Sequence, residues 1–170
     1  MAKTGKQVQG DIYKLLMDSS LSVLLSGGIY RSGYRPRDSR SEDAVVTFTA
    51  GLPDQIQTGV VTINIYVPDV DPYGNGVLVE DGARTEELER AAQVWADSLT
   101  ADVSCYKFKL QSAIYTEEEA EINQHFVVVK LGYSYYGDDD APIKFSKDAE
   151  EDTLATDSSD ERVTSRETEA

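Results

Sequence analysis

GVVTINIYVPD, residues 59–69, is the stretch that decides the fold of this chain of 170 residues. Four β-branched apolar residues alternate in it with Thr62, Asn64 and Tyr66, which is the period-two pattern of a half-buried strand. The Pro-Asp pair that follows ends the strand, because proline has no N–H to give to a sheet and aspartate favours turns. We therefore expect the other elements to be arranged around this strand.

The neighbouring sequence predicts one helix before the strand and one after it. Val8, Ile12, Leu15 and Leu16 recur at helical spacing, and a short apolar piece, residues 21–25, follows and ends at Gly27 and Gly28, which we expect in the left-handed conformation. Residues 85–99 form the second helix, with an apolar stripe and Thr85 as its N-cap.

Further strands follow from alternation of apolar and polar residues. Residues 44–49 are rich in β-branched residues and pair antiparallel with the central strand. Residues 105–111 have one apolar face, whereas residues 124–136 are apolar on both faces and should form a central strand or lie in a subunit interface. Residues 116–121 are expected as a charged loop or a single helical turn. The whole pattern predicts an α+β fold with a mainly antiparallel sheet of about four strands and two packed helices.

Composition divides the chain into a domain, residues 1–136, and a tail, residues 137–170. The tail carries twelve acidic and four basic side chains, a net charge of −8, and is nearly free of aromatic residues. Such a segment buries too little apolar surface to offset the entropy of ordering, so we expect it to be disordered or ordered by a partner. Ile143 and Phe145 are the exception, and we expect them to dock on a neighbouring chain as a short added strand.

Charge and cysteine content limit the possible partners. A net charge of −15 argues against nonspecific attraction to nucleic acid or to an anionic membrane. Cys105 is the only cysteine of the sequence and excludes an internal disulfide. No stretch has the length of a signal peptide's apolar core or the roughly 20 apolar residues of a membrane-spanning helix. We expect a soluble protein that is made and used without secretion.

No catalytic or metal-binding pattern stands out. The sequence has neither G-x-S-x-G nor a glycine-rich phosphate loop nor H-E-x-x-H, and His125 is its only histidine. The segment from Asp69 to Glu80 resembles a calcium loop poorly, because Glu80 comes too early to be the closing ligand; an Asn-Gly turn at residues 75–76 explains it better. We expect no enzyme, no metal and no cofactor, although the many carboxylates leave a small hydrolase as a remote alternative.

IYRSGYRPRDSRSED, residues 29–43, is the locally basic segment of this acidic chain. Its four arginines alternate with Tyr30 and Tyr34, a combination that also occurs in phosphate and base recognition. The overall charge favours an exposed loop whose arginines contact acidic groups of the same or a neighbouring chain.

The order of these elements, with GGIY at 27–30, INIYVPD at 63–69 and a late strand that begins near His125, resembles the tail-completion or tail-terminator family of tailed bacteriophages over residues 11–136. The resemblance implies a structural virion protein that forms a ring, commonly of six subunits, at the head–tail junction. Such a ring ends the tail tube and joins it to the portal or head connector; in a short-tailed phage it would be a neck ring. DNA would pass through without specific binding.

This resemblance makes the arginine segment a candidate contact surface. The residues that we expect to contact a neighbouring subunit or the connector are Arg31, Tyr34, Arg35, Arg37, Arg40 and Phe145. The alternative function is an acidic binding module, or a DNA-mimic type of inhibitor, that acts through the C-terminal tail. Deletion of residues 138–170 would abolish the activity of such a module but would leave a ring-forming domain folded.

Overall fold

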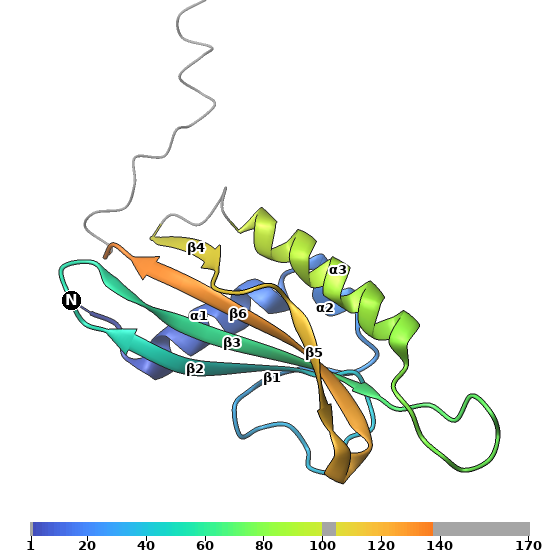
Figure 1. Cartoon of the computed structure of the whole chain (residues 1–170). Helices are drawn as coiled ribbons and strands as arrows, with labels where there is room; N and C mark the ends of the chain where they lie inside the picture. The colour runs from blue at the N-terminus through green and yellow to red at the C-terminus, as the bar shows by residue number, and fades with distance from the viewer. Residues whose placement is uncertain (1, 100–104, 138–170) are drawn as a thin grey trace, which may run out of the picture.

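The computed structural model describes residues 2–99 and 105–137, which form a two-layer α+β fold with helices on one face of a six-stranded sheet (Figure 1). The elements in chain order are α1 (Gly5–Met17), α2 (Ser20–Leu24), β1 (Ile29–Arg31), β2 (Ala44–Leu52), β3 (Gln57–Pro68), α3 (Gly82–Ser98), β4 (Tyr106–Leu110), β5 (Tyr115–Glu119), the 3-10 turn η1 (Ala120–Ile122) and β6 (Gln124–Tyr135). The predicted fold class is confirmed.

The predicted central strand is β3, which pairs antiparallel with β2 on one side and with β6 on the other. The sheet order is β1-β2-β3-β6-β4, and β5 also pairs with β6. Because β4 and β5 pair with different halves of β6, they share one edge of the sheet. The described residues therefore contain six strands rather than about four, and β1 runs parallel to β2 in an otherwise antiparallel sheet.

The hydrophobic core lies between the helices and one face of the sheet. Ile63 of β3 is paired with Val129 of β6, and both side chains are fully buried. Ile12 of α1 and Leu88 of α3 belong to the same buried cluster, so both helices cover the same face. This burial confirms that β6 is a central strand.

Helix α3 begins three residues earlier than predicted. Asp81 is its N-cap, and its Oδ1 accepts a hydrogen bond from the N–H of Arg84 at 3.2 Å. The predicted cap Thr85 is instead a buried residue of the first turns, whose hydroxyl donates to Glu80 Oε1 at 2.9 Å. The prediction was wrong because an aspartate nearer to the preceding loop satisfies the free N–H groups first.

Two other predictions need correction. Gly27 and Gly28 do not have a positive φ angle; the reason for glycine at 27 is space, since a Cβ atom there would lie 2.0 Å from Asp43 Oδ1. Residues 116–121 form most of β5 and the start of η1 rather than a plain loop, because their backbone pairs with β6 while the charged side chains face outward at the edge. The extra short helix α2 also raises the number of α-helices to three in the described chain.

Candidate interaction surface

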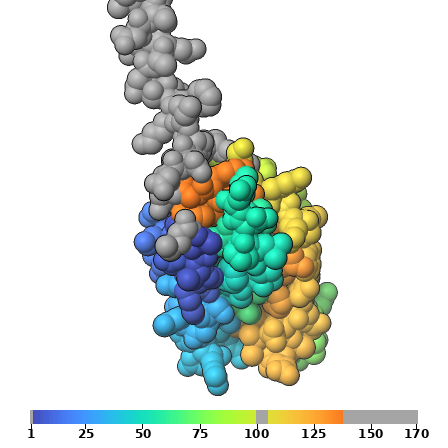
Figure 2. Space-filling model, turned by 90° about the vertical axis from the view of Figure 1, so that its left-hand side faces the viewer, coloured from blue at the N-terminus to red at the C-terminus, as the bar shows by residue number. Residues whose placement is uncertain are grey.

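Two loops at one end of the sheet carry exposed aromatic, apolar and basic side chains. The arginine loop, residues 32–43, joins β1 to β2, and the apolar arm, residues 69–81, joins β3 to α3. Figure 1 shows them on either side of the paired ends of β3 and β6, with the green arm projecting away from the body. In Figure 2 the arginine loop, in light blue, forms the lower end of the molecule.

Arg35 fixes the arginine loop to its own subunit. Its Nε donates to Asp43 Oδ2 at 2.9 Å, its Nη2 donates to Gln124 Oε1 at 2.8 Å, and its guanidinium lies 4.0 Å from the ring centre of Tyr66. Only 12% of the Arg35 side chain is exposed. A planar guanidinium satisfies all three contacts at once, which a lysine cannot do.

Arg31 also has an internal role. Its Nε donates to Gln9 Oε1 at 3.1 Å and its Nη2 donates to the carbonyl of Lys6 at 2.7 Å, which attaches β1 to α1. Two of the four arginines predicted to contact another subunit are therefore engaged within this one.

The outward part of the arginine loop consists of Tyr34, Arg37 and Arg40, which are all exposed. Tyr34 is 72% exposed, and Arg40 makes only a long contact of 3.4 Å with the carbonyl of Ile122. These three residues remain candidates for contact with another molecule. The sixth candidate, Phe145, lies outside the described residues.

The apolar arm is a second surface, which the sequence analysis treated only as a turn. Every residue from 70 to 80 is exposed. The large apolar side chains among them are Val70, Tyr73, Val77, Leu78 and Val79. Three consecutive apolar residues, 77–79, in an otherwise polar loop were the signal that could have identified it, since exposed apolar clusters of this kind mark interaction sites.

The apolar arm has a defined shape. Asp71 accepts hydrogen bonds from the N–H groups of Asn75 and Gly76 at 3.2 and 2.9 Å, and Asn75 Oδ1 accepts one from Val77 at 3.0 Å. Gly74 and Gly76 adopt positive φ angles, whereas Asn75 between them does not, so the loop differs from the two-residue turn that Asn75-Gly76 predicts. The backbones of Val70 and Val79 close the loop with two hydrogen bonds of 2.9 Å. The apolar side chains are thus held outward by a preformed backbone.

Both ends of the arm are anchored in the body. Asp69 at its start lies 2.6 Å from His125 Nδ1, so the lone histidine has a structural partner. At its end, Arg84 in the first turn of α3 donates to both carboxylate oxygens of Glu42, at 2.6 and 2.8 Å, and to the carbonyl of Leu24 at 2.8 Å. These bonds hold the pKa of the Glu42 carboxyl below its ordinary value, against the opposing effect of burial.

Glu42 and Asp43 connect the two loops. Glu42 binds the arginine at the base of the apolar arm, and the adjacent Asp43 binds Arg35 of the arginine loop. Both carboxylates are buried. Asp43 also accepts hydrogen bonds from the N–H of Gly28 and the hydroxyl of Ser39. Two neighbouring residues therefore fix the positions of both loops.

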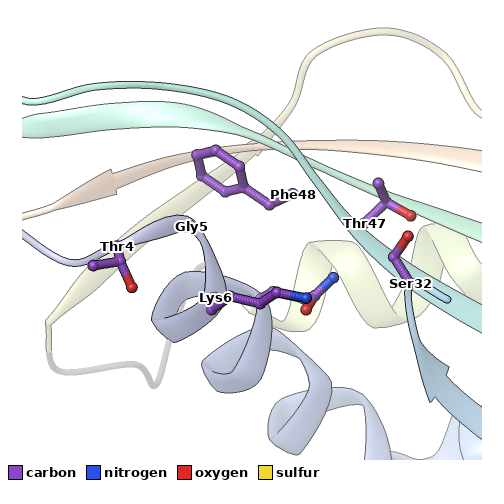
Figure 3. Close-up of a pocket in the computed structure, with 7 residues that line it drawn as sticks. Thr4, Gly5, Lys6, Ser32, Thr47 and Phe48 are labelled. Carbon is purple, nitrogen blue, oxygen red and sulfur yellow. The ribbon is translucent and has the colours of Figure 1, made fainter. Parts of the chain in front are cut away.

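A surface pocket lies beside α1, and no residue of the apolar arm lines it. The pocket in Figure 3, of about 440 Å³, lies between the start of α1 and the outer part of β2. Its lining consists of Thr4, Gly5, Lys6, Gln9, Ser32, Thr47 and Phe48. Lys6 is the one charged group among these seven, and Thr4, Ser32 and Thr47 contribute hydroxyl groups. Within residues 2–99 and 105–137 there is no cluster of three metal-ligating side chains, and no helix there is long and apolar enough to cross a membrane.

Comparisons with known proteins leave the family open. No family model and no curated protein matches the chain. Among the solved structures that match, one shares 12% sequence identity, and the match covers 79% of this chain and 96% of that chain with a TM-score of 0.43. Its name states no function, and a similarity this low carries no argument.

Proposed function

We propose that this protein is a structural subunit of a tailed-phage virion, forming a ring at the head–tail junction that ends the tail tube and joins it to the head connector. The observation that supports this role most directly is the apolar arm, because a rigid loop with five exposed apolar side chains needs a binding partner. The order of elements and the GGIY and INIYVPD motifs, which resemble the tail-terminator family, support this class of assembly.

The rest of the surface is compatible with assembly. Tyr34, Arg37 and Arg40 are carried on a loop that internal bonds keep in place, so they can contact a neighbour at little cost in ordering entropy. The net charge of −15 suits a ring through which DNA passes without adhering. A subunit that acts through its outer surface needs no reactive pocket.

The native mass of the purified chain tests the proposal. It is measured by light scattering across a concentration series, with negative-stain images of the largest species. A closed ring of about six subunits is expected, because such rings are point-group assemblies with one repeated contact. A chain that stays monomeric at every concentration would overturn self-assembly into a ring.

A second candidate function is an acidic binding module acting through the tail. The observation that favours it is the net charge of −8 in residues 137–170. A chain that ends after Gly137 separates the two functions: a ring-forming domain keeps its oligomeric state, whereas the acidic module loses its capture of a basic partner.

A further inference from the structure

The apolar arm has two properties that together indicate the nature of its partner. It exposes Tyr73 by 80% and Val77 by 57%. Between residues 69 and 81 it contains no lysine or arginine, and its exposed acids are Asp71 and Glu80, whereas Asp69 is only 7% exposed beside His125. An apolar surface bordered by acids fits a partner that presents an aromatic or apolar group next to cations.

The same protein exposes such a surface at the arginine loop. Tyr34, Arg37 and Arg40 stand outward there, and between residues 32 and 41 Asp38 is the single acid beside three arginines. Tyrosine and arginine are the side chains that most often provide binding energy at the centre of protein interfaces. The exposed helix α2 offers Val23 and Leu24 but carries no charged residue, so it matches the arm less well.

We infer that the apolar arm of one copy binds the outward part of the arginine loop of the next copy. The inference rests on the proposed ring and names the contact that would build it. Tyr73 packs beside Tyr34, and the guanidinium groups of Arg37 and Arg40 face the acidic border of the arm.

The positions of the two loops give this contact its symmetry. The apolar arm and the arginine loop are two different patches, and they lie on either side of the paired ends of β3 and β6 (Figure 1). A contact between two different patches is heterologous and propagates from copy to copy, closing into a ring if the rotation permits. Glu42 and Asp43 attach both loops to one short segment of the subunit, so the two patches keep fixed positions relative to each other.

Cross-linking between introduced cysteines tests this contact. In a Cys105→Ser background, Asp38→Cys and Val77→Cys are combined in one chain, and the native oligomer is treated with a short bis-maleimide. The expected result is a ladder of covalent oligomers in a denaturing gel. Mixed single variants should give covalent dimers and no ladder, as a heterologous contact requires.

The matched control replaces Val77→Cys by Val94→Cys. Val94 is also an exposed valine, 69% exposed, but it lies on α3 away from the arm. The control pair should give no ladder. A ladder with the control pair and none with the arm pair would overturn the inferred contact, even if the native mass shows a ring.

Association measurements complete the test. Arg37→Glu with Arg40→Glu, and separately Tyr73→Ser, should each weaken association at least about tenfold, which corresponds to about 1.4 kcal/mol. Combining the changes should add less than the sum, because both remove the same contact. A ring with unchanged affinity in all variants would overturn the contact but not the ring, whereas a monomeric wild type would overturn the ring itself.

Discussion

Replacing Arg84 with methionine removes the anchor at the base of the apolar arm while keeping most of the side-chain volume. Arg84 donates two hydrogen bonds to Glu42, and further bonds reach the carbonyl of Leu24 and the carboxylate of Glu87. The Glu42 side chain is only 11% exposed. In the variant a buried carboxylate would keep one partner, the N–H of Ser26 at 3.2 Å.

The expected loss follows from this burial. Removing one partner of a buried ion pair costs about 3–5 kcal/mol, and because Arg84 is 24% exposed we expect about 2–3 kcal/mol after solvent screening. For a chain of this size that corresponds to a fall of about 4–12 °C in Tm. The combined variant Arg84→Met, Glu42→Gln should recover more than half of the loss, because no unpaired buried charge remains.

Urea unfolding monitored by circular dichroism measures both variants, and its pH dependence adds an independent check. Arg84 lowers the pKa of Glu42 below 4.5 in the folded protein, so this stabilisation is complete above about pH 4.5 and is lost as the pH falls through the folded pKa. The wild type should therefore lose more stability than Arg84→Met on acidification. A loss below about 0.5 kcal/mol in Arg84→Met, or a double variant with the summed loss of both single changes, would refute the reasoning.

Three further changes are tested by the same unfolding measurement. Gly27→Ala should lower the free energy of unfolding by about 3 kcal/mol, because the added Cβ would overlap Asp43. Gly33→Ala should lower it by only about 1 kcal/mol, because Gly33 has φ at +88° but open space around it. Equal losses would contradict the steric argument. Arg35→Lys should lose about 2 kcal/mol, since lysine cannot keep both hydrogen bonds and the ring contact, and an unchanged stability would show that Arg35 is not an internal anchor. A chain that ends after Gly137 should unfold within about 0.5 kcal/mol of the full chain, and a larger loss would make the tail part of the folded domain.

Periodic patterns predicted the elements whose side chains face the core. The alternation in residues 59–69 corresponds to β3, and the stripe around Ile12 corresponds to α1. Both patterns arise because one face of the element is buried. One-sided burial appears in the sequence as a regular spacing of apolar residues. β5 was missed because it is a short edge strand whose exposed glutamates carry no apolar face, and its strand character comes from pairing with β6.

The candidate surface was only partly predictable for a different reason. Local composition identified the arginine loop, but it could not tell Arg35, which folds back onto Tyr66, from Arg37, which points outward. That difference depends on Gln124, which is 89 residues away in the sequence. The apolar arm was not predicted as a surface, because its glycine, asparagine and aspartate residues indicate only a turn of the backbone. A turn does not show whether the neighbouring valine side chains are buried or exposed.

Glu42 and Asp43 form ion pairs with two arginines that fold back onto the same subunit, Arg84 and Arg35. Each carboxylate neutralises one inward arginine at the cost of burying a charge, and each is stabilised by backbone N–H donors, Ser26 for Glu42 and Gly28 for Asp43. Arg31 is held by neutral acceptors, and Arg37 and Arg40 remain exposed as the basic residues of the proposed docking surface. The same two residues tie the arginine loop to the base of the apolar arm, so two adjacent ion pairs join the two proposed docking surfaces.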